Sequence, residues 1–105
     1  MNKRNASGRH IENENEFLTS GEVGDWSFRL SESETPVMHI LIWLPCGPDD
    51  KSVAVLPVHE HPDASIPGAW YWNGNIESPT VEPSIFHHAE DEWHGWMTEG
   101  QLISA

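Results

Sequence analysis

Short apolar runs alternate with turn signals along most of the chain. Residues 26–30 alternate apolar and polar positions with period two, which predicts a half-buried strand. Residues 37–44 form the most apolar run, and its branched and aromatic side chains predict a strand buried on both faces. After a turn cluster over 45–50, residues 52–58 return as a second strand, and Pro57 places this strand at a sheet edge or a strand end. The two runs therefore predict a hairpin.

The second half of the chain continues this pattern with shorter strands. Residues 70–72 predict a strand, and the Asn-Gly dipeptide that follows is typical of a tight two-residue hairpin. Prolines divide residues 77–85 into extended pieces that cannot be helical. Residues 93–98 and 101–104 flank a Glu-Gly turn and predict a closing hairpin.

These patterns define the expected fold class and domain organisation. Since no segment shows a helical period over ten or more residues, we expect a mainly β protein, and 105 residues leave room for one domain. Residues 1–24 are polar and predict a flexible tail that orders only against a partner or the domain. Residues 25–105 predict a single small domain of short antiparallel strands and hairpins.

The six tryptophans are many for a chain of this length. Each tryptophan buries about 150–250 Å², so a few of them replace many aliphatic side chains and predict a tryptophan-rich core. Trp93 and Trp96 lie three positions apart in a predicted strand, so they face opposite sides of the sheet. At least one of the six is therefore expected at the surface.

The charge of the chain is strongly one-sided. Five Lys and Arg against 17 Asp and Glu give a net charge of −12, and no Lys or Arg follows Lys51. Such a field repels nucleic-acid phosphates and anionic lipid, and it attracts basic protein surfaces. No apolar run approaches the ~20 residues of a membrane helix, and no signal sequence is evident. A single cysteine, Cys46, excludes an internal disulfide and suits the reducing cytoplasm.

Seven histidines raise the question of a metal site. Zinc binds imidazole nitrogen and thiolate sulfur, so the candidate ligands are Cys46, His59, His61 and His94. His59 and His61 would share one face of an extended chain. The chain has no Cys-x-x-Cys pair, so these histidines can instead lie at turns or on the surface. We therefore expect no cofactor, with zinc as the alternative.

The sequence offers no familiar catalytic motif. Nucleophilic catalysis needs a serine or cysteine beside a histidine and an orienting acid. Neither a Gly-x-Ser-x-Gly elbow nor a glycine-rich phosphate loop is present. The sequence therefore predicts no catalytic residues and a protein that is not an enzyme.

Three segments resemble a known family. Residues 70–75 (Trp-Tyr-Trp-Asn-Gly-Asn), 79–85 (Pro-Thr-Val-Glu-Pro-Ser-Ile) and 93–96 (Trp-His-Gly-Trp) resemble small phage and prophage proteins of unassigned function, some of which carry the label "ammonia monooxygenase". The resemblance covers roughly residues 38–105. It implies a phage or prophage origin and expression in the bacterial cytoplasm, but no reaction. No copper or di-iron pattern supports the oxygenase label.

Charge, tryptophan content and resemblance together predict a small acidic phage-type accessory protein. It would bind a host protein with a basic surface stoichiometrically. One form of this is an inhibitor of anti-CRISPR or anti-restriction type, which blocks a nucleic-acid-handling defence system through an acidic, phosphate-mimicking surface. The expected partner-binding residues are Glu77, Glu82, Glu90, Asp91, Glu92, Trp93 and Trp96. The alternatives are a zinc-binding domain, structural or hydrolytic, and a virion or assembly component.

Overall fold

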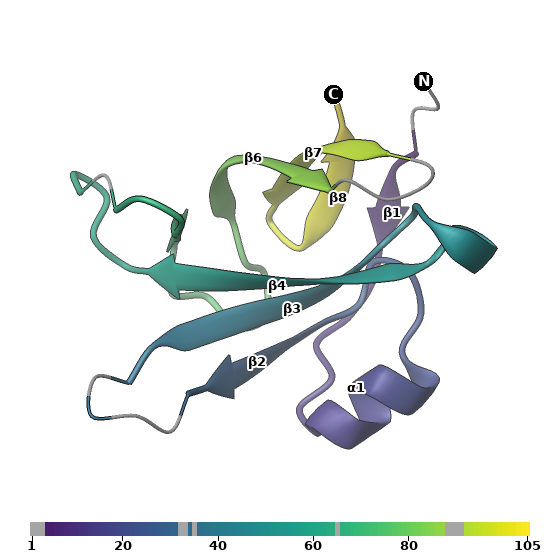
Figure 1. Ribbon diagram of the computed structural model, residues 1–105, viewed down its shortest axis with the longest axis horizontal. Helices are drawn as coiled ribbons and strands as arrows, with labels where there is room; N and C mark the ends of the chain where they lie inside the picture. Colours follow the sequence, from purple (N-terminus) through teal and green to yellow (C-terminus); the bar gives the residue numbers. More distant parts are fainter. Residues whose placement is uncertain (1–3, 32–33, 35, 65, 88–91) are drawn as a thin grey trace.

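The computed structural model describes residues 4–31, 34, 36–64, 66–87 and 92–105. Within these residues, eight strands form one sheet in the order β1-β8-β7-β6-β5-β4-β3-β2 (Figure 1). The strands are β1 (Ala6–Ser7), β2 (Trp26–Leu30), β3 (Met38–Leu44), β4 (Ser52–His59), β5 (Trp70–Trp72), β6 (Val81–His87), β7 (Trp93–Thr98) and β8 (Gln101–Ser104). One helix, α1 (Glu14–Ser20), and a short 3-10 helix (Pro48–Asp50) complete the described elements. The predicted mainly β fold is confirmed.

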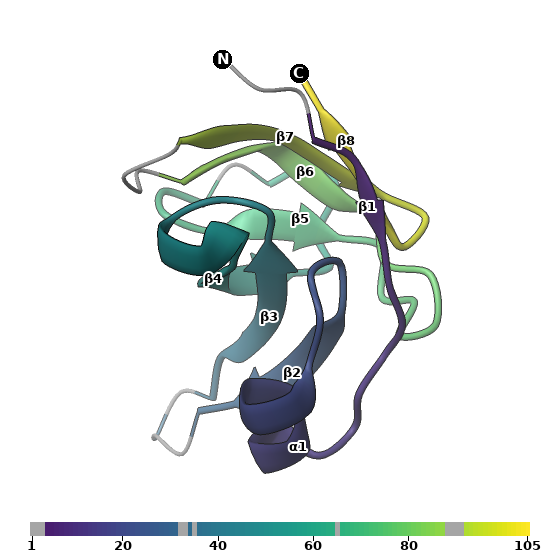
Figure 2. The same cartoon turned by 90° about the vertical axis from the view of Figure 1, so that its right-hand side faces the viewer.

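The sheet is strongly curled, with β7 and β8 at one end of the molecule and β2 and β3 at the other (Figure 2). Neighbouring strands are antiparallel except β4 and β5, which pair in parallel. The chain leaving β1 then reaches β2, where the Trp26 amide donates to the Arg9 carbonyl (3.2 Å) and the Ile11 amide donates to the Trp26 carbonyl (2.9 Å). This contact covers backbone groups that an open sheet would leave unpaired at its edges.

Strand β3 is buried on both faces, as its continuous apolar run predicted. Ile40, Ile42 and Leu44 point into the main core enclosed by the curled sheet. Leu41 is fully buried on the opposite face, in a second cluster against which Trp43 packs. Because β3 has no solvated face, it lacks the polar alternation seen in β2.

Tryptophans fill the main core, which confirms that prediction too. Trp26, Trp72 and Trp93 are buried, and the Trp93 indole N–H donates to the Arg4 carbonyl at 2.9 Å. Trp96 lies on the other side of β7 and is 39% exposed. The opposite facing of Trp93 and Trp96 is confirmed. Trp93 is only 1% exposed, so the expectation that it binds a partner is wrong.

The described part of the segment predicted as a flexible tail orders against the domain. Helix α1 begins at its N-cap Asn13, whose side chain accepts a hydrogen bond from the Glu16 amide (2.9 Å). Phe17 is fully buried in the second cluster, stacked on Trp43 with 5.5 Å between ring centroids. The helix therefore covers the outer face of β3. The sequence did not predict this packing, because Phe17 is the one buried residue of a short helix and gives no periodic pattern.

An exposed ion pair also connects α1 to the sheet. The Arg29 Nε donates to the Glu14 carboxylate, with 2.6 Å between the atoms. This hydrogen bond holds the pKa of Glu14 below its ordinary value and raises the pKa of Arg29. With its folded-state pKa lowered, Glu14 stabilises the fold above the pKa it has when unfolded, and loses that effect as the pH falls through the folded-state value.

The β3–β4 and β7–β8 hairpins match the predicted ones, but the Asn-Gly hairpin does not form. Strands β5 and β6 pair through Tyr71–Glu82 and Trp72–Val81, so a longer loop, residues 73–80, connects them. The Asn73 Oδ1 accepts hydrogen bonds from the amides of Asn75 and Thr80, each at 3.1 Å. The Asn73 side chain thus holds the two ends of this eight-residue loop together, in place of a two-residue turn.

The buried position of Phe17 leads to the first testable prediction. Phe17→Ala should lower the free energy of unfolding by about 3–5 kcal/mol, because it leaves a cavity between α1 and β3. The neighbouring Leu18 is 38% exposed, so Leu18→Ala should cost about 1 kcal/mol or less. Urea denaturation measures both values. Equal losses in the two variants would contradict the packing described here.

Candidate functional site

The pairing of β6 with β7 contains an irregularity in register. Val81 pairs with Met97, and the next pair joins Ile85 to Gly95. Residues 82–84 therefore stand opposite a single β7 residue, Trp96. The Glu82–Pro83 peptide bond within this segment is cis, which shortens the distance between the Cα atoms of these two residues. Irregularities of this kind bend a strand and redirect its side chains, and they are common beside active sites.

Ser84 and His94 form a hydrogen-bonded pair next to this irregularity. His94 is the partner of Phe86 across the two strands, and Ser84 lies two positions before Phe86 on the same outer face. The His94 Nε2 is 3.0 Å from the Ser84 Oγ. The imidazole also contacts the rings of Phe86 and Trp96, with centroid separations of 5.4 and 5.9 Å. These contacts restrain the orientation of the imidazole.

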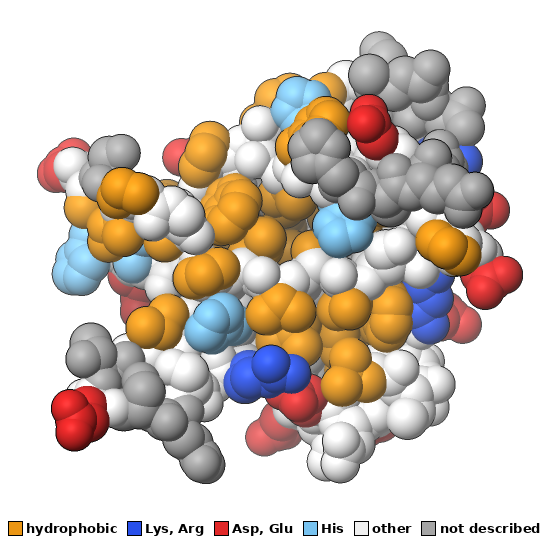
Figure 3. Space-filling view, viewed as in Figure 1, with side chains coloured by type: hydrophobic (Ala, Val, Ile, Leu, Met, Phe, Trp, Pro, Cys, Tyr) orange, Lys and Arg blue, Asp and Glu red, His pale blue; other side chains and the backbone are white. Residues whose placement is uncertain are grey.

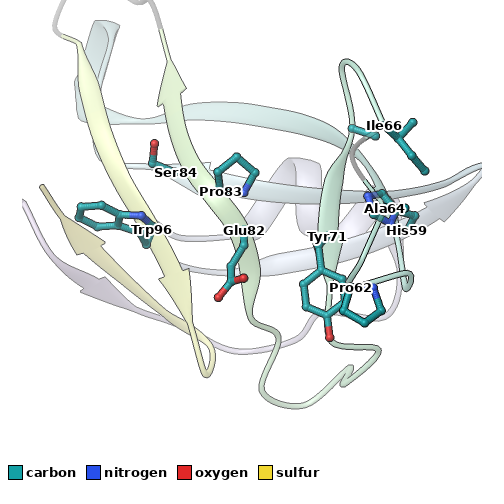
Figure 4. A pocket seen from close by; sticks show the side chains of 10 residues that line it. His59, Pro62, Ala64, Ile66, Tyr71, Glu82, Pro83, Ser84 and Trp96 are labelled. Carbon is teal, nitrogen blue, oxygen red and sulfur yellow. The ribbon is translucent and has the colours of Figure 1, made fainter.

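The Ser84 side of this pair borders an open cleft of about 720 Å³ (Figure 4). Strands β6 and β7 contribute Ser84 and Trp96, and the facing wall comes from Tyr71 and the loop after β4. The lining residues are His59, Pro62, Ala64, Ile66, Ala69, Tyr71, Glu82, Pro83, Ser84 and Trp96. A hydroxyl paired with an imidazole at the edge of a cleft is the arrangement from which a serine can attack a bound carbonyl.

The backbone around the pair is held in place by two further features. The Trp70 indole N–H donates to the Ser84 carbonyl at 3.3 Å. Gly95, which follows His94, allows β7 to approach β8 closely, since an added Cβ would lie 2.2 Å from the Ile103 carbonyl oxygen. The position of Ser84 thus depends on β5, and that of His94 depends on β8.

The four candidate zinc ligands do not come together. Cys46 is fully buried beyond the end of β3, whereas His59 lies at the other end of the β3–β4 hairpin, about 20 Å away by strand geometry. His59 and His61 stack with 6.0 Å between their rings, and His94 is bonded to Ser84. In the part of the chain that the structure describes, no three His, Cys, Asp or Glu residues are grouped to hold a metal ion.

The fold brings two of the candidate partner-binding residues, Glu82 and Trp96, together in the cleft and separates the other described ones. Glu77 lies in the loop between β5 and β6, Glu82 lies in the cleft, and Glu92 precedes β7. Glu90 and Asp91 lie outside the described residues. On the face shown in Figure 3, acidic side chains lie around the rim while hydrophobic ones gather in the middle. The described residues of that face form no continuous acidic patch of the kind expected for phosphate mimicry.

The comparison with known families decides what kind of protein this is. Residues 20–105 match the family described as bacterial ubiquitination-like system serine protease (BubE). The chain belongs to the BubE family. No curated protein and no solved structure matches the chain. No helix among the described residues has the length and apolar character needed to cross a membrane.

Membership of the BubE family corrects the function predicted from the sequence. The family is one of serine proteases of a bacterial ubiquitination-like system, so the expectation of a phage anti-defence inhibitor is wrong. The expectation of a protein that is not an enzyme is wrong for the same reason. The resemblance to phage and prophage proteins stays a prediction that this match does not test.

The Ser84–His94 pair is not part of any local sequence motif, and for this reason it was not predicted. The two residues lie ten positions apart and meet only across neighbouring strands. A usable signal was present in the Pro-Ser-Ile and Trp-His-Gly segments, which place a serine and a histidine in consecutive strands. An antiparallel pairing of such strands brings the two side chains onto one face.

The Trp70 hydrogen bond leads to a prediction about the reactivity of Ser84. Trp70→Phe keeps an aromatic ring but removes the N–H that holds the Ser84 carbonyl, so labelling of Ser84 by a fluorophosphonate should slow at least about threefold. The matched control is Trp43→Phe, which removes an indole hydrogen bond to the Phe17 carbonyl instead. Labelling rates are read by intact mass spectrometry. Equal slowing in both variants would show that Trp70 has no specific role.

Proposed function

We propose that this protein is a serine protease in which Ser84 is the nucleophile and His94 is the general base. The observation that carries the proposal is the 3.0 Å contact between the Ser84 Oγ and the His94 Nε2 at the edge of the cleft. The BubE match supports the same reaction class, since the family is described as a serine protease.

The proposed reaction is acyl transfer in two steps. The His94 Nε2 takes the proton of the Ser84 hydroxyl while the Oγ attacks the carbonyl carbon of the scissile bond. The resulting imidazolium gives that proton to the leaving amine, and the C–N bond breaks to leave an acyl ester on Ser84. Water then attacks the ester with His94 again as base, which releases the carboxylic acid and restores the serine.

The described residues give this centre two catalytic members. They are Ser84 and His94. The orientation that a third residue provides in many serine proteases comes here from the rings of Phe86 and Trp96. Packing of this kind fixes the imidazole plane, and it leaves Nε2 directed at the Ser84 hydroxyl.

The family description indicates the biological setting of the proposed activity. The substrates would be proteins of a bacterial ubiquitination-like system, whose chains enter the open cleft in an extended conformation. We place the protein in the bacterial cytoplasm, in keeping with a single, buried cysteine, Cys46.

Covalent labelling tests the proposed nucleophile directly. A fluorophosphonate should add one adduct per molecule of the wild-type protein, and Ser84→Ala should abolish the adduct. His94→Ala should slow labelling by about 100-fold or more, because the base that removes the hydroxyl proton is gone. Intact mass and peptide mapping identify the modified residue.

The matched control for this experiment is Ser104→Ala. Ser104 lies in β8, and its described hydrogen bond to Asn5 uses the backbone amide, so the fold keeps that contact. Its labelling should equal that of the wild type. An adduct that persists in Ser84→Ala, or that disappears in Ser104→Ala, would refute the assignment of Ser84.

A further inference from the structure

Three cleft residues beside Ser84 form a surface suited to a positive charge. Tyr71 and Glu82 are direct partners across β5 and β6, which puts their Cβ atoms about 4.5–5.5 Å apart on one face. Trp96 stands opposite the irregular segment that contains Glu82. Figure 4 shows the Glu82 side chain between Tyr71 and Trp96. A carboxylate flanked by two aromatic rings is a favourable site for an ammonium or guanidinium group.

The Glu82 carboxylate is available for such a contact. Glu82 is exposed, and none of the ion pairs or hydrogen bonds among the described side chains engages it. The described ion pairs join Arg29 to Glu14 and Arg4 to Asp50. Moreover, every cleft residue follows Lys51, and the chain has no Lys or Arg beyond that position. A cationic substrate group would therefore meet no fixed positive charge from this part of the chain.

We infer that Tyr71, Glu82 and Trp96 bind the side chain of a lysine or arginine in the substrate, next to the bond that Ser84 cleaves. This inference rests on the proposed protease function. The aliphatic stem packs along the two rings while the charged end meets the carboxylate. Glu82 precedes Ser84 by two positions, and with the cis bond between Glu82 and Pro83 their Cα atoms lie at most about 7 Å apart, so one long side chain spans the separation. The cationic residue therefore directly flanks the scissile bond.

Cleavage of matched peptides tests this specificity. The probes are internally quenched octapeptides that differ only at the two residues flanking the central bond, where lysine, arginine, norleucine or glutamate is placed on either side. Lysine and arginine peptides should show kcat/KM values about tenfold above the norleucine peptide, which has a stem of similar length without the charge. The glutamate peptides should be cleaved slowest, and mass spectrometry locates the cleaved bond.

Variants of Glu82 connect the preference to this site. Glu82→Gln should reduce the lysine-to-norleucine ratio to within about twofold of unity, and Glu82→Lys should favour the glutamate peptides. The matched control is Glu99→Gln, which makes the same charge change at the exposed turn between β7 and β8. This control should keep the wild-type ratio, because a local contact rather than the net charge produces the preference.

The outcomes separate this inference from the proposed function. Three outcomes would overturn the specificity: a wild-type lysine-to-norleucine ratio of kcat/KM near unity, an equal loss of that ratio in Glu82→Gln and Glu99→Gln, or no cleavage of any lysine or arginine peptide. In each case, fluorophosphonate labelling of Ser84 would still support the protease. If Ser84 is not labelled at all, the proposed function fails and the inference fails with it.

Discussion

The candidate site depends on the irregular pairing of β6 with β7. Between the pairs Val81–Met97 and Ile85–Gly95, strand β6 has three residues where β7 has one. The excess of two is even, so the alternation of faces is conserved and both Val81 and Ile85 remain in the core. An excess of one would have turned every later side chain of β6 to the opposite face. The fold can therefore displace Ser84 without losing the buried face of the strand.

This constraint explains how a small sheet positions two reactive side chains. Ile85, Trp93 and Met97 secure the inner faces of β6 and β7, while Ser84 and His94 meet on the outer face. The short β5 contributes the Trp70 hydrogen bond to Ser84 and the Tyr71 wall of the cleft. Catalytic geometry and core packing thus use opposite faces of the same strands, as alternating β structure allows.

The sequence predicted the parts of the fold that depend on local pattern. The period of residues 26–30, the apolar run of 37–44 and the Glu-Gly turn before residue 101 each predicted the observed strand or hairpin. It did not predict that α1 orders on the domain, because one aromatic side chain, Phe17, decides this through contact with β3. Long-range contacts of this kind leave no periodic signal in the chain.

The site was predicted less well than the fold, for the same physical reason. Glu82 and Trp96 were singled out from charge and aromatic character, and both line the cleft, although the binding role first expected for them was a different one. Ser84 was not singled out, since its chemistry depends on His94 in the next strand rather than on its sequence neighbours. The histidine content predicted a zinc site instead, but two of its expected ligands, Cys46 and His59, lie at opposite ends of a hairpin.

The most direct measurement is a crystal structure of the protein after reaction with diisopropyl fluorophosphate. We expect a phosphorus atom bonded to the Ser84 Oγ, the phosphoryl group in the cleft, and β6 and β7 paired through Val81–Met97 and Ile85–Gly95. His94 should remain beside Ser84 with its Nε2 facing the modified oxygen. A regular β6–β7 ladder without the extra residues, or phosphorus bonded to a different side chain, would contradict it.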